Sequence, residues 1–265
     1  SLIKVYRNTS TVGVLNTSSF AAPVSFTANA ATRGVTVRDV DNDGKLDIIV
    51  EGTSSVSVFR NNSTVGTIAL DAKVDFASGS LPNYTAVEDL DGDGKPDLAV
   101  ANFSSGTVSV FRNTSTPGVI NSGSFATNVD FAVNTNPQGV AIGDIDGDGK
   151  KDIVVSNRGS NNISVISNTS TPGTINGSSF AAKVDFTSAS GPVGVVVADF
   201  DGDGKVDVAT ACNTGNVISV FRNTSTPGSI TLPTRLDVPA GSGPFHQITV
   251  ADMDGDSKPD LIAGA

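Results

Sequence analysis

Several residue types that usually carry chemistry are nearly missing from this chain of 265 residues. It has one cysteine, Cys212, one histidine, His246, no tryptophan and two tyrosines. A lone cysteine excludes an intramolecular disulfide framework. Catalysis commonly needs a general base or a nucleophile placed beside one, and neither His246 nor Cys212 lies in a recognisable catalytic motif. We therefore do not expect an enzyme.

Positive charge and long apolar runs are also scarce. The chain has 17 Lys and Arg against 27 Asp and Glu, which gives a formal net charge of −10. Nucleic-acid binding requires a basic surface, so no nucleic-acid partner is expected. No stretch approaches 18 consecutive apolar residues, so no membrane span is expected either.

Helical patterning is almost absent. Apolar residues alternate over short runs instead of recurring at the helical spacing, and Gly, Pro, Ser, Thr or Asn interrupt nearly every long stretch. The sequence therefore predicts an all-β protein. Uniform repetition without a linker predicts one domain over residues 1–265.

One acidic nonapeptide, Asp-x-Asp-x-Asp-Gly/Ser-Lys-x-Asp, is present in five copies. The copies begin at Asp39, Asp89, Asp144, Asp199 and Asp252, in steps of 50, 55, 55 and 53 residues. A step of 52 residues leads from Asp252 through the chain end round to Asp39 (265 − 252 + 39). Such periods are typical of repeat architectures, and five whole periods fit the chain as a circle.

The nonapeptide has the donor set of a calcium loop. Hard oxygen ligands on alternate residues of a tight loop can converge on one cation, and calcium takes six to eight such oxygens, whereas magnesium demands a stricter octahedron. Each copy offers four aspartate side chains and the backbone carbonyl of its lysine. The expected ligands are Asp39, Asp41, Asp43, Lys45 and Asp47; Asp89, Asp91, Asp93, Lys95 and Asp97; Asp144, Asp146, Asp148, Lys150 and Asp152; Asp199, Asp201, Asp203, Lys205 and Asp207; and Asp252, Asp254, Asp256, Lys258 and Asp260.

These loops are not EF-hands. An EF-hand needs a bidentate acid at position twelve and flanking helices, but position twelve is apolar or Thr here, and the flanks are short, β-branched and bounded by glycine. Each loop is therefore predicted to connect two strands. In the fifth copy Ser257 replaces a glycine that should have positive φ, at a cost of about 1 kcal/mol, so we expect the fifth site to be the weakest. Asn42 replaces a glycine at a position that should be less demanding.

Charge supports about five ions in a structural role, one for each repeat. The five motifs hold 20 of the 27 acidic residues (4 × 5), and five divalent cations would cancel the net charge of −10. Asp and Gly also suit turns without any metal, which is the alternative interpretation. Four carboxylates in one loop repel each other without a counterion, and five copies in register favour calcium.

Four strands are predicted for each repeat. In the third repeat they cover residues 139–145, 151–156, 162–167 and about 182–186, and repeated four-stranded units are typical of a β-propeller. Residues 2–8 match the third-strand segments 56–61 and 218–223, while residues 261–263 match a second strand. The sequence thus predicts a five-bladed propeller of four-stranded antiparallel blades, closed by the N-terminal strands.

Two further segments carry a family resemblance. Gly-Val-Ala-Ile-Gly-Asp-Ile-Asp-Gly-Asp-Gly-Lys at 139–150 and Val-Phe-Arg-Asn-Thr-Ser-Thr-Pro-Gly at 110–118 resemble FG-GAP/VCBS-type repeats, which occur in integrin α-subunit propellers and in many bacterial secreted proteins. The resemblance covers the whole chain. It implies a calcium-loaded propeller, secreted or at the cell surface, that serves adhesion or carbohydrate recognition. The literal Phe-Gly and Gly-Ala-Pro elements of integrins are absent, so integrin-type ligand binding is not implied.

Residues just before the first strand of each repeat are candidates for ligand binding. They would lie at the mouth of the central channel, opposite the acidic loops, and variation on a regular scaffold suits recognition. The candidates are Arg33, Asn83, Tyr84, Gln138 and His246. Val193 holds the equivalent place in the fourth repeat, and Gln247 follows His246. Ordinary solvated loop residues are the alternative interpretation.

The predicted function is a calcium-binding extracellular module for carbohydrate or cell-surface ligands. A polysaccharide lyase that uses His246 with Tyr84, or a scaffold for protein interaction, are the alternatives. The lack of Trp weighs against a lectin without excluding one. Triplets of the type Asn-x-Ser/Thr, such as those starting at Asn8, Asn113 and Asn223, are interpreted as turn chemistry.

Overall fold

The computed structural model describes residues 1–241 and 247–264, and the regular secondary structure of these residues is entirely β. Four sheets have four antiparallel strands, and two sheets have two. The strands are β1 Leu2–Val5, β2 Val24–Thr27, β3 Val35–Arg38, β4 Asp47–Glu51, β5 Ser55–Phe59, β6 Val74–Ala77, β7 Pro82–Glu88, β8 Asp97–Asn102, β9 Thr107–Phe111, β10 Val129–Ala132, β11 Pro137–Gly143, β12 Asp152–Asn157, β13 Asn162–Ile166, β14 Val184–Thr187, β15 Pro192–Ala198, β16 Asp207–Cys212, β17 Val217–Arg222, β18 Thr234–Pro239, β19 Ile248–Ala251 and β20 Asp260–Ala263.

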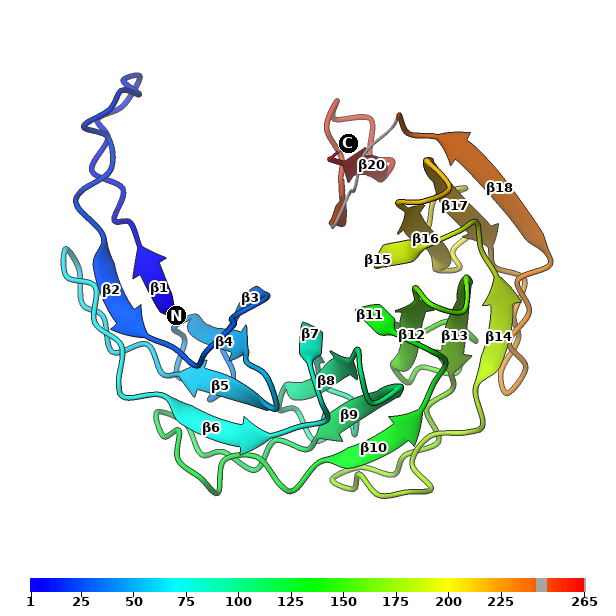
Figure 1. Ribbon diagram of the computed structural model, residues 1–265, viewed down its shortest axis with the longest axis horizontal. Helices are drawn as coiled ribbons and strands as arrows, with labels where there is room; N and C mark the ends of the chain where they lie inside the picture. Colours follow the sequence, from blue (N-terminus) through cyan, green and yellow to red (C-terminus); the bar gives the residue numbers. More distant parts are fainter. Residues whose placement is uncertain (242–246, 265) are drawn as a thin grey trace.

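Each four-stranded sheet is a meander in which neighbours in sequence are neighbours in space. The first strands β3, β7, β11 and β15 lie on the inner side of a curved row of sheets, and the fourth strands β6, β10, β14 and β18 lie on the outer side (Figure 1). In the third repeat every strand boundary falls within two residues of its predicted position. The all-β class and the four-stranded repeat unit are confirmed.

The hydrophobic core lies between successive sheets. The second strands are buried along their whole length in the four-stranded sheets, because a neighbouring sheet covers each face. In β8, Leu98 and Val100 pack with Val58 of the preceding sheet, whereas Ala99 between them packs with Ile153 of the following sheet. Alternate side chains of a strand point to opposite faces, so one short apolar strand serves two interfaces.

The two-stranded sheets lie at the two ends of the row (Figure 1). β1 pairs with β2, and this sheet packs against the β3–β6 sheet through Ile3, Ile48 and Phe59. At the other end β19 pairs with β20 and packs against β15 and β16. Among the described residues no strand pairing joins β1 to β20, so the fold has four complete blades and two half blades.

Candidate functional site

The five acidic loops all connect a first strand to a second strand, and two positions of each are left-handed. At the sixth position φ is 85° for Gly44 and 69° for Ser257, so this residue holds a conformation that favours glycine, as predicted. The fourth position is left-handed as well: Asn42 has a φ of 56°. The expectation that Asn42 stands at a less demanding position was therefore wrong, although Asn tolerates this region better than most residues.

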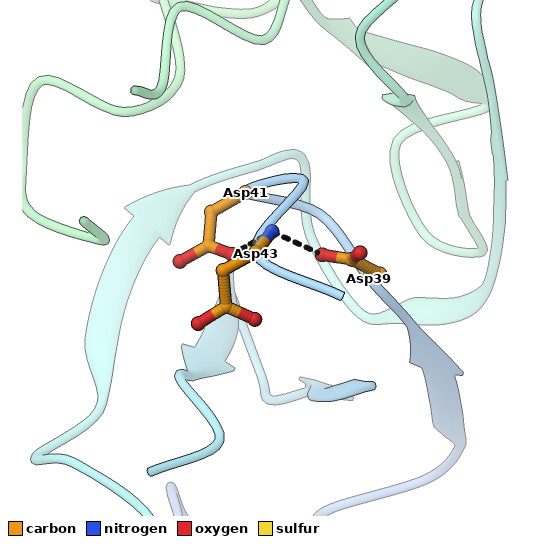
Figure 2. A group of neighbouring side chains, drawn as sticks. All are labelled: Asp39, Asp41 and Asp43. Atoms are coloured by element: carbon orange, nitrogen blue, oxygen red, sulfur yellow. Dashed lines mark hydrogen bonds between the residues drawn. The ribbon is translucent and has the colours of Figure 1, made fainter. Parts of the chain in front are cut away.

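The aspartates of each loop converge. In the first loop the side chains of Asp39, Asp41 and Asp43 approach one another (Figure 2), and the Asp43 amide donates to Asp39 and to Asp41, both at 3.2 Å. Three carboxylates in each loop offer oxygens within 4.8 Å of one another. These groups are Asp39, Asp41 and Asp43; Asp89, Asp91 and Asp97; Asp144, Asp146 and Asp152; Asp199, Asp201 and Asp203; and Asp252, Asp254 and Asp260. An all-oxygen set of this kind suits a hard cation such as calcium.

The last aspartate of the motif fastens the loop to the sheet. Asp47 accepts the Val40 amide at 3.1 Å and the Asn61 amide at 2.8 Å, one on each carboxylate oxygen. Burial raises the pKa of Asp47 to about 6, and the same cause raises the pKa of Asp97 to about 7 and that of Asp152 to about 6. Because a carboxylate oxygen has a second lone pair, this aspartate can still serve as the predicted ligand.

One buried carboxylate oxygen of the loops lacks a hydrogen-bond donor among the described residues. Asp91 is 2% exposed, and its Oδ2 has no hydrogen-bond donor among the described residues; the nearest recorded cation is Arg112 Nε at 3.9 Å. Burial and the charge of Asp93 raise the pKa of Asp91. A buried acceptor without a partner costs about 1–3 kcal/mol, and more when it is charged. A bound cation would remove this cost, so the donor set fits calcium.

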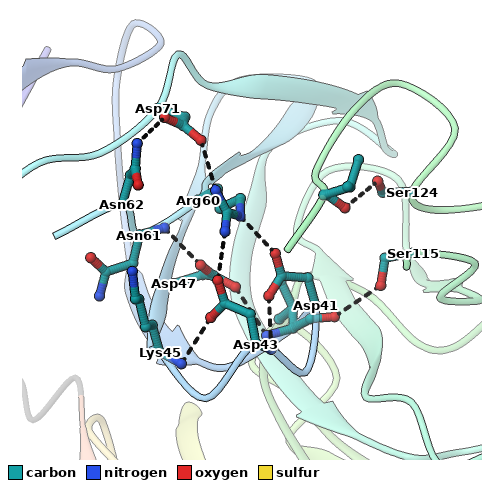
Figure 3. Close-up of polar contacts among 12 residues, drawn as sticks. Asp41, Asp43, Lys45, Asp47, Arg60, Asn61, Asn62, Asp71, Ser115 and Ser124 are labelled. Carbon is teal, nitrogen blue, oxygen red and sulfur yellow. Dashed lines mark hydrogen bonds and ion pairs between the residues drawn. The ribbon is translucent and has the colours of Figure 1, made fainter. Parts of the chain in front are cut away.

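Arginines at the end of the third strand supply positive charge to the same loops. Arg60 contacts Asp41 at 2.9 Å, Asp43 at 2.6 Å and Asp71 at 3.3 Å (Figure 3). In the fourth repeat Arg222 contacts Asp201 at 2.6 Å and Asp203 at 2.9 Å.

These contacts were not predicted. The signal for them is the recurring Phe-Arg-Asn at the end of the third strand, which is Phe59 to Asn61 in the first repeat. The third repeat has Ser167 in place of the arginine.

The lysine of the motif turns its side chain away from the loop in three repeats. Lys95 Nζ donates to the Ser115 carbonyl at 2.8 Å, and Lys150 and Lys205 make the equivalent bonds to Ser170 and Ser225. The ammonium group thus does not neutralise the loop carboxylates there. Coordination by the lysine carbonyl stays a prediction.

Four of the predicted ligand-binding residues share one cavity of about 290 Å³, which we call the rim pocket. It is lined by Arg33, Asn83, Tyr84, Phe103, Gln138 and Arg158. Phe103 and Arg158 were missed because they come from the turns that follow β8 and β12. His246 lies outside the described residues, so the lyase alternative that needs it stays a prediction.

β-Bulges position the two side-chain amides of the rim pocket, those of Asn83 and Gln138. The pairing of β7 with β8 shifts between Pro82 and Tyr84, and that of β11 with β12 shifts between Pro137 and Val140. A bulge re-aims a side chain at the end of a strand, and Asn83 and Gln138 lie within these two shifts. Val193, at the equivalent bulge, is fully buried, and Gln247 lines a separate cavity with Tyr84.

A buried acid near this pocket was also missed. Glu51 stands where other repeats have Ala101, Ser156 and Ala211, and it is fully buried. Neither carboxylate oxygen makes a well-formed hydrogen bond within the described residues, and burial raises the pKa of Glu51. No pattern in the sequence marks it.

Comparison with protein families gives five overlapping matches to one family, the FG-GAP-like repeat. They cover residues 2–50, 39–100, 89–155, 152–210 and 199–263. The chain belongs to the FG-GAP-like repeat family. No curated protein matches it.

The FG-GAP repeats form a β-propeller-like row of four-stranded sheets, and solved structures are similar to it. BBS1N in a crystal structure with ARL6DN, soaked with mercury, has a TM-score of 0.55 at 14% identity, over 92% of this chain and 63% of that one. Rhamnogalacturonan lyase YesW has a TM-score of 0.48 at 15% identity, over 88% of this chain and 55% of that one. The FG-GAP chain thus spans less than two thirds of either. Its described residues contain no helix that is long and apolar enough to cross a membrane.

Three of the Asn-x-Ser/Thr triplets join neighbouring blades. Asn113 is buried, and its Nδ2 donates to the Val40 carbonyl of the preceding blade at 2.7 Å and to Pro96 at 2.8 Å. Asn168 and Asn223 make the equivalent bonds to Leu90 and Ile145, each at 2.7 Å. The predicted turn bond is present too, because Asn113 Oδ1 accepts the Ser115 amide. Turn chemistry is therefore only part of their role, and we call these three residues the blade asparagines.

Proposed function

We propose that this FG-GAP repeat protein is a calcium-stabilised extracellular module, secreted or held at the cell surface, that binds a carbohydrate or another cell-surface ligand in the rim pocket. The observation that carries the proposal is the separation of two kinds of site. The acidic loops follow the first strand of each repeat and have nearly the same sequence five times. The rim pocket is built at the other end of the first strands, from their starts and from the turns after the second strands, by residues that differ between repeats. Repetition suits a scaffold, and variation suits recognition.

The proposed calcium ions would be held by the aspartates of the five loops and the carbonyl of each motif lysine. A bound divalent cation would supply positive charge to carboxylates that otherwise repel one another. Two loop aspartates also bond to the next blade. The Asp91 carbonyl accepts the Gly173 amide at 3.2 Å, and Asp146 Oδ2 accepts the Gly228 amide at 2.9 Å. Ordering a loop thus supports the interface beside it.

A closed ring of five blades is the second part of the proposal. With the blades numbered one to four from the β3–β6 sheet to the β15–β18 sheet, the blade asparagines connect blades one to two, two to three, and three to four. Asn8 and Asn61 hold the same position, but among the described residues their side chains make no bond to another blade: Asn61 Nδ2 donates to the Leu46 carbonyl of its own blade, and Asn8 Oδ1 accepts the Ser10 amide. Pairing β1 with β20 would give these two asparagines the carbonyls of the two remaining interfaces.

Burial of the loops supports closure. Asp41, Asp91 and Asp146, the second aspartates of the first three loops, are 1–3% exposed, because the next blade covers each loop. The corresponding Asp201 and Asp254 are exposed. Closure would bring the hairpin after β1 and the hairpin after β5 next to these two loops.

A glycan array tests the binding function. The calcium-loaded protein should bind a restricted set of glycans, and substitution of Asn83 and Gln138 by Ala should abolish that binding. Arg235→Ala on the outer strand β18 is the matched control and should change nothing. Selective binding that survives the rim substitutions, or no binding to any glycan, would refute the carbohydrate proposal.

A further inference from the structure

Two arginines in the rim pocket lack the partners that most other arginines have. Among the described residues the side chains of Arg38, Arg60, Arg112, Arg222 and Arg235 each form an ion pair with a carboxylate. The side chains of Arg7, Arg33 and Arg158 form none with any described residue. Arg7 holds the position of Arg60 on the N-terminal half blade, where ring closure would give it the fifth acidic loop.

Arg33 and Arg158 are left, and both line the rim pocket. They come from different blades, one just before β3 and the other just after β12. In a chain with a net charge of −10, two unpaired guanidinium groups at one cavity make a local positive field. Guanidinium groups match carboxylates with two parallel hydrogen bonds, so an anionic ligand is indicated.

A hydrogen-bond acceptor in the same pocket restricts the ligand further. Gln138 is 5% exposed, and its Oε1 has no donor among the described residues. A simple anion offers acceptors only and would leave this oxygen unpaired. A ligand that also carries hydroxyl groups would satisfy it, since each hydroxyl donates one hydrogen bond.

The remaining surfaces suit a sugar ring. Tyr84 and Phe103 are half-buried and present apolar ring area to the cavity. The cavity of about 290 Å³ is just below the range for small-molecule pockets, about 300–1,000 Å³, which suits a single sugar residue of a longer chain. Burial raises the pKa of the nearby Glu51 carboxyl, which favours its neutral form.

We propose that the rim pocket binds an acidic sugar, with Arg33 and Arg158 on the sugar carboxylate and Gln138 accepting a hydrogen bond from a ring hydroxyl. The proposal rests on the carbohydrate function proposed above and names its ligand class, a glycan that contains uronic acid. Neutral glycans should bind weakly, because they leave both guanidinium groups without a partner.

Matched trisaccharides test this directly. Calorimetric titration of the calcium-loaded protein would use β-1,4-linked trimers of glucuronic acid and of galacturonic acid, their neutral counterparts in which each carboxylate is a CH₂OH group, and the neutral trimers sulfated at that position. We expect at least one uronic acid trimer to bind tenfold or more tightly than its neutral counterpart. Arg33→Ala and Arg158→Ala should each remove most of that preference, and Gln138→Leu should weaken binding of the acid trimer.

The controls separate this proposal from the carbohydrate function. Arg235→Ala should leave affinity unchanged, and a melting scan of every variant checks that it is folded. Equal binding of acid and neutral trimers, lost on substitution of Asn83, would overturn the acidic-sugar proposal and keep the carbohydrate function. Stronger binding of the sulfated trimer would overturn the carboxylate assignment, and absence of binding to all trimers and to the glycan array would overturn both proposals.

Discussion

The strand-end arginines occupy two of the carboxylates that a calcium ion would use. Arg60 is 19% exposed and spans Asp41 and Asp43, so in the metal-free protein it supplies the countercharge that this loop needs. The third repeat has Ser167 instead, so no arginine at this position supplies positive charge to its loop. If the loops bind calcium as proposed, they would differ in how much they gain from the ion, although their acidic motifs are nearly identical.

Replacing this arginine should destabilise the metal-free protein. We expect Arg60→Ala to lower the free energy of unfolding in excess chelator by about 1–3 kcal/mol, because it leaves buried Asp41 without its partner. The same change should cost less in excess calcium, which can take over the countercharge. Urea denaturation in both conditions measures this difference, with Ser167→Arg as the converse variant. A loss that is equal with and without calcium would contradict this account.

Buried loop aspartates also set the pH dependence. In the metal-free fold the pKa of Asp97 is about 7 and those of Asp47 and Asp152 are about 6, against an ordinary value near 4. Between about pH 4 and 7 the native state therefore binds more protons than the unfolded state, so its stability falls as pH rises. Melting scans in chelator from pH 5 to 8 should show a falling Tm, and calcium should remove the trend. A metal-free protein that melts higher at pH 8 than at pH 5 would count against these pKa shifts.

Much of the candidate metal site could be predicted from the sequence, because its residues lie within nine positions of one another. Spacing alone placed Ser257 and the glycines at the sixth position of the motif in the left-handed region. It could not show that Asp47 accepts the Asn61 amide, or that Arg60 reaches Asp41, because these contacts depend on how the third strand pairs with the second. Arg158 and Glu51 were missed for a similar reason: neither belongs to a repeated pattern.

Strands and turns were the most predictable elements, and the contacts between blades were the least. Alternation and glycine boundaries placed every strand of the third repeat within two residues. The triplet Asn-Thr-Ser was predicted as a turn, but the carbonyl that Asn113 binds belongs to Val40, 73 residues earlier. A local pattern holds no information about a partner in another blade.

Loss of a blade asparagine should therefore cost more than loss of a turn residue. We expect Asn113→Ala to reduce the free energy of unfolding by about 1–3 kcal/mol, since it leaves the Val40 carbonyl without its donor at a buried interface. Asn62→Ala, an exposed asparagine with one surface hydrogen bond, is the matched control and should stay within about 0.5 kcal/mol of the wild type. Equal effects of the two changes would show that the bond between blades contributes nothing measurable.

The whole molecule is built by repetition, and its two half blades are complementary. β19 and β20 correspond to a first and a second strand, while β1 and β2 correspond to a third and a fourth. A row of blades that ends in half blades leaves strand edges without partners, and closure removes such edges. Five periods without a remainder were the reason to expect a ring, and the half blades lie where a ring would join.

Substitution of two asparagines, Asn8 and Asn61, tests whether the blades form a closed ring. If β1 pairs with β20 in solution, Asn8→Ala and Asn61→Ala should each destabilise the protein about as much as Asn113→Ala, because each removes a bond between blades. If the row stays open, both changes should resemble Asn62→Ala. Urea denaturation of the four variants distinguishes these outcomes, and small-angle scattering gives an independent measure of the shape.

Calcium binding to the metal-free protein is the most direct test of the central claim. Calorimetric titration of the chelator-treated, dialysed chain with calcium, followed by a melting scan of the product, measures stoichiometry and stabilisation on the same sample. The account predicts about five ions per chain, as the five motifs require, and a Tm that rises with calcium concentration because the ion binds the folded state. Absence of binding heat together with an unchanged Tm would contradict it.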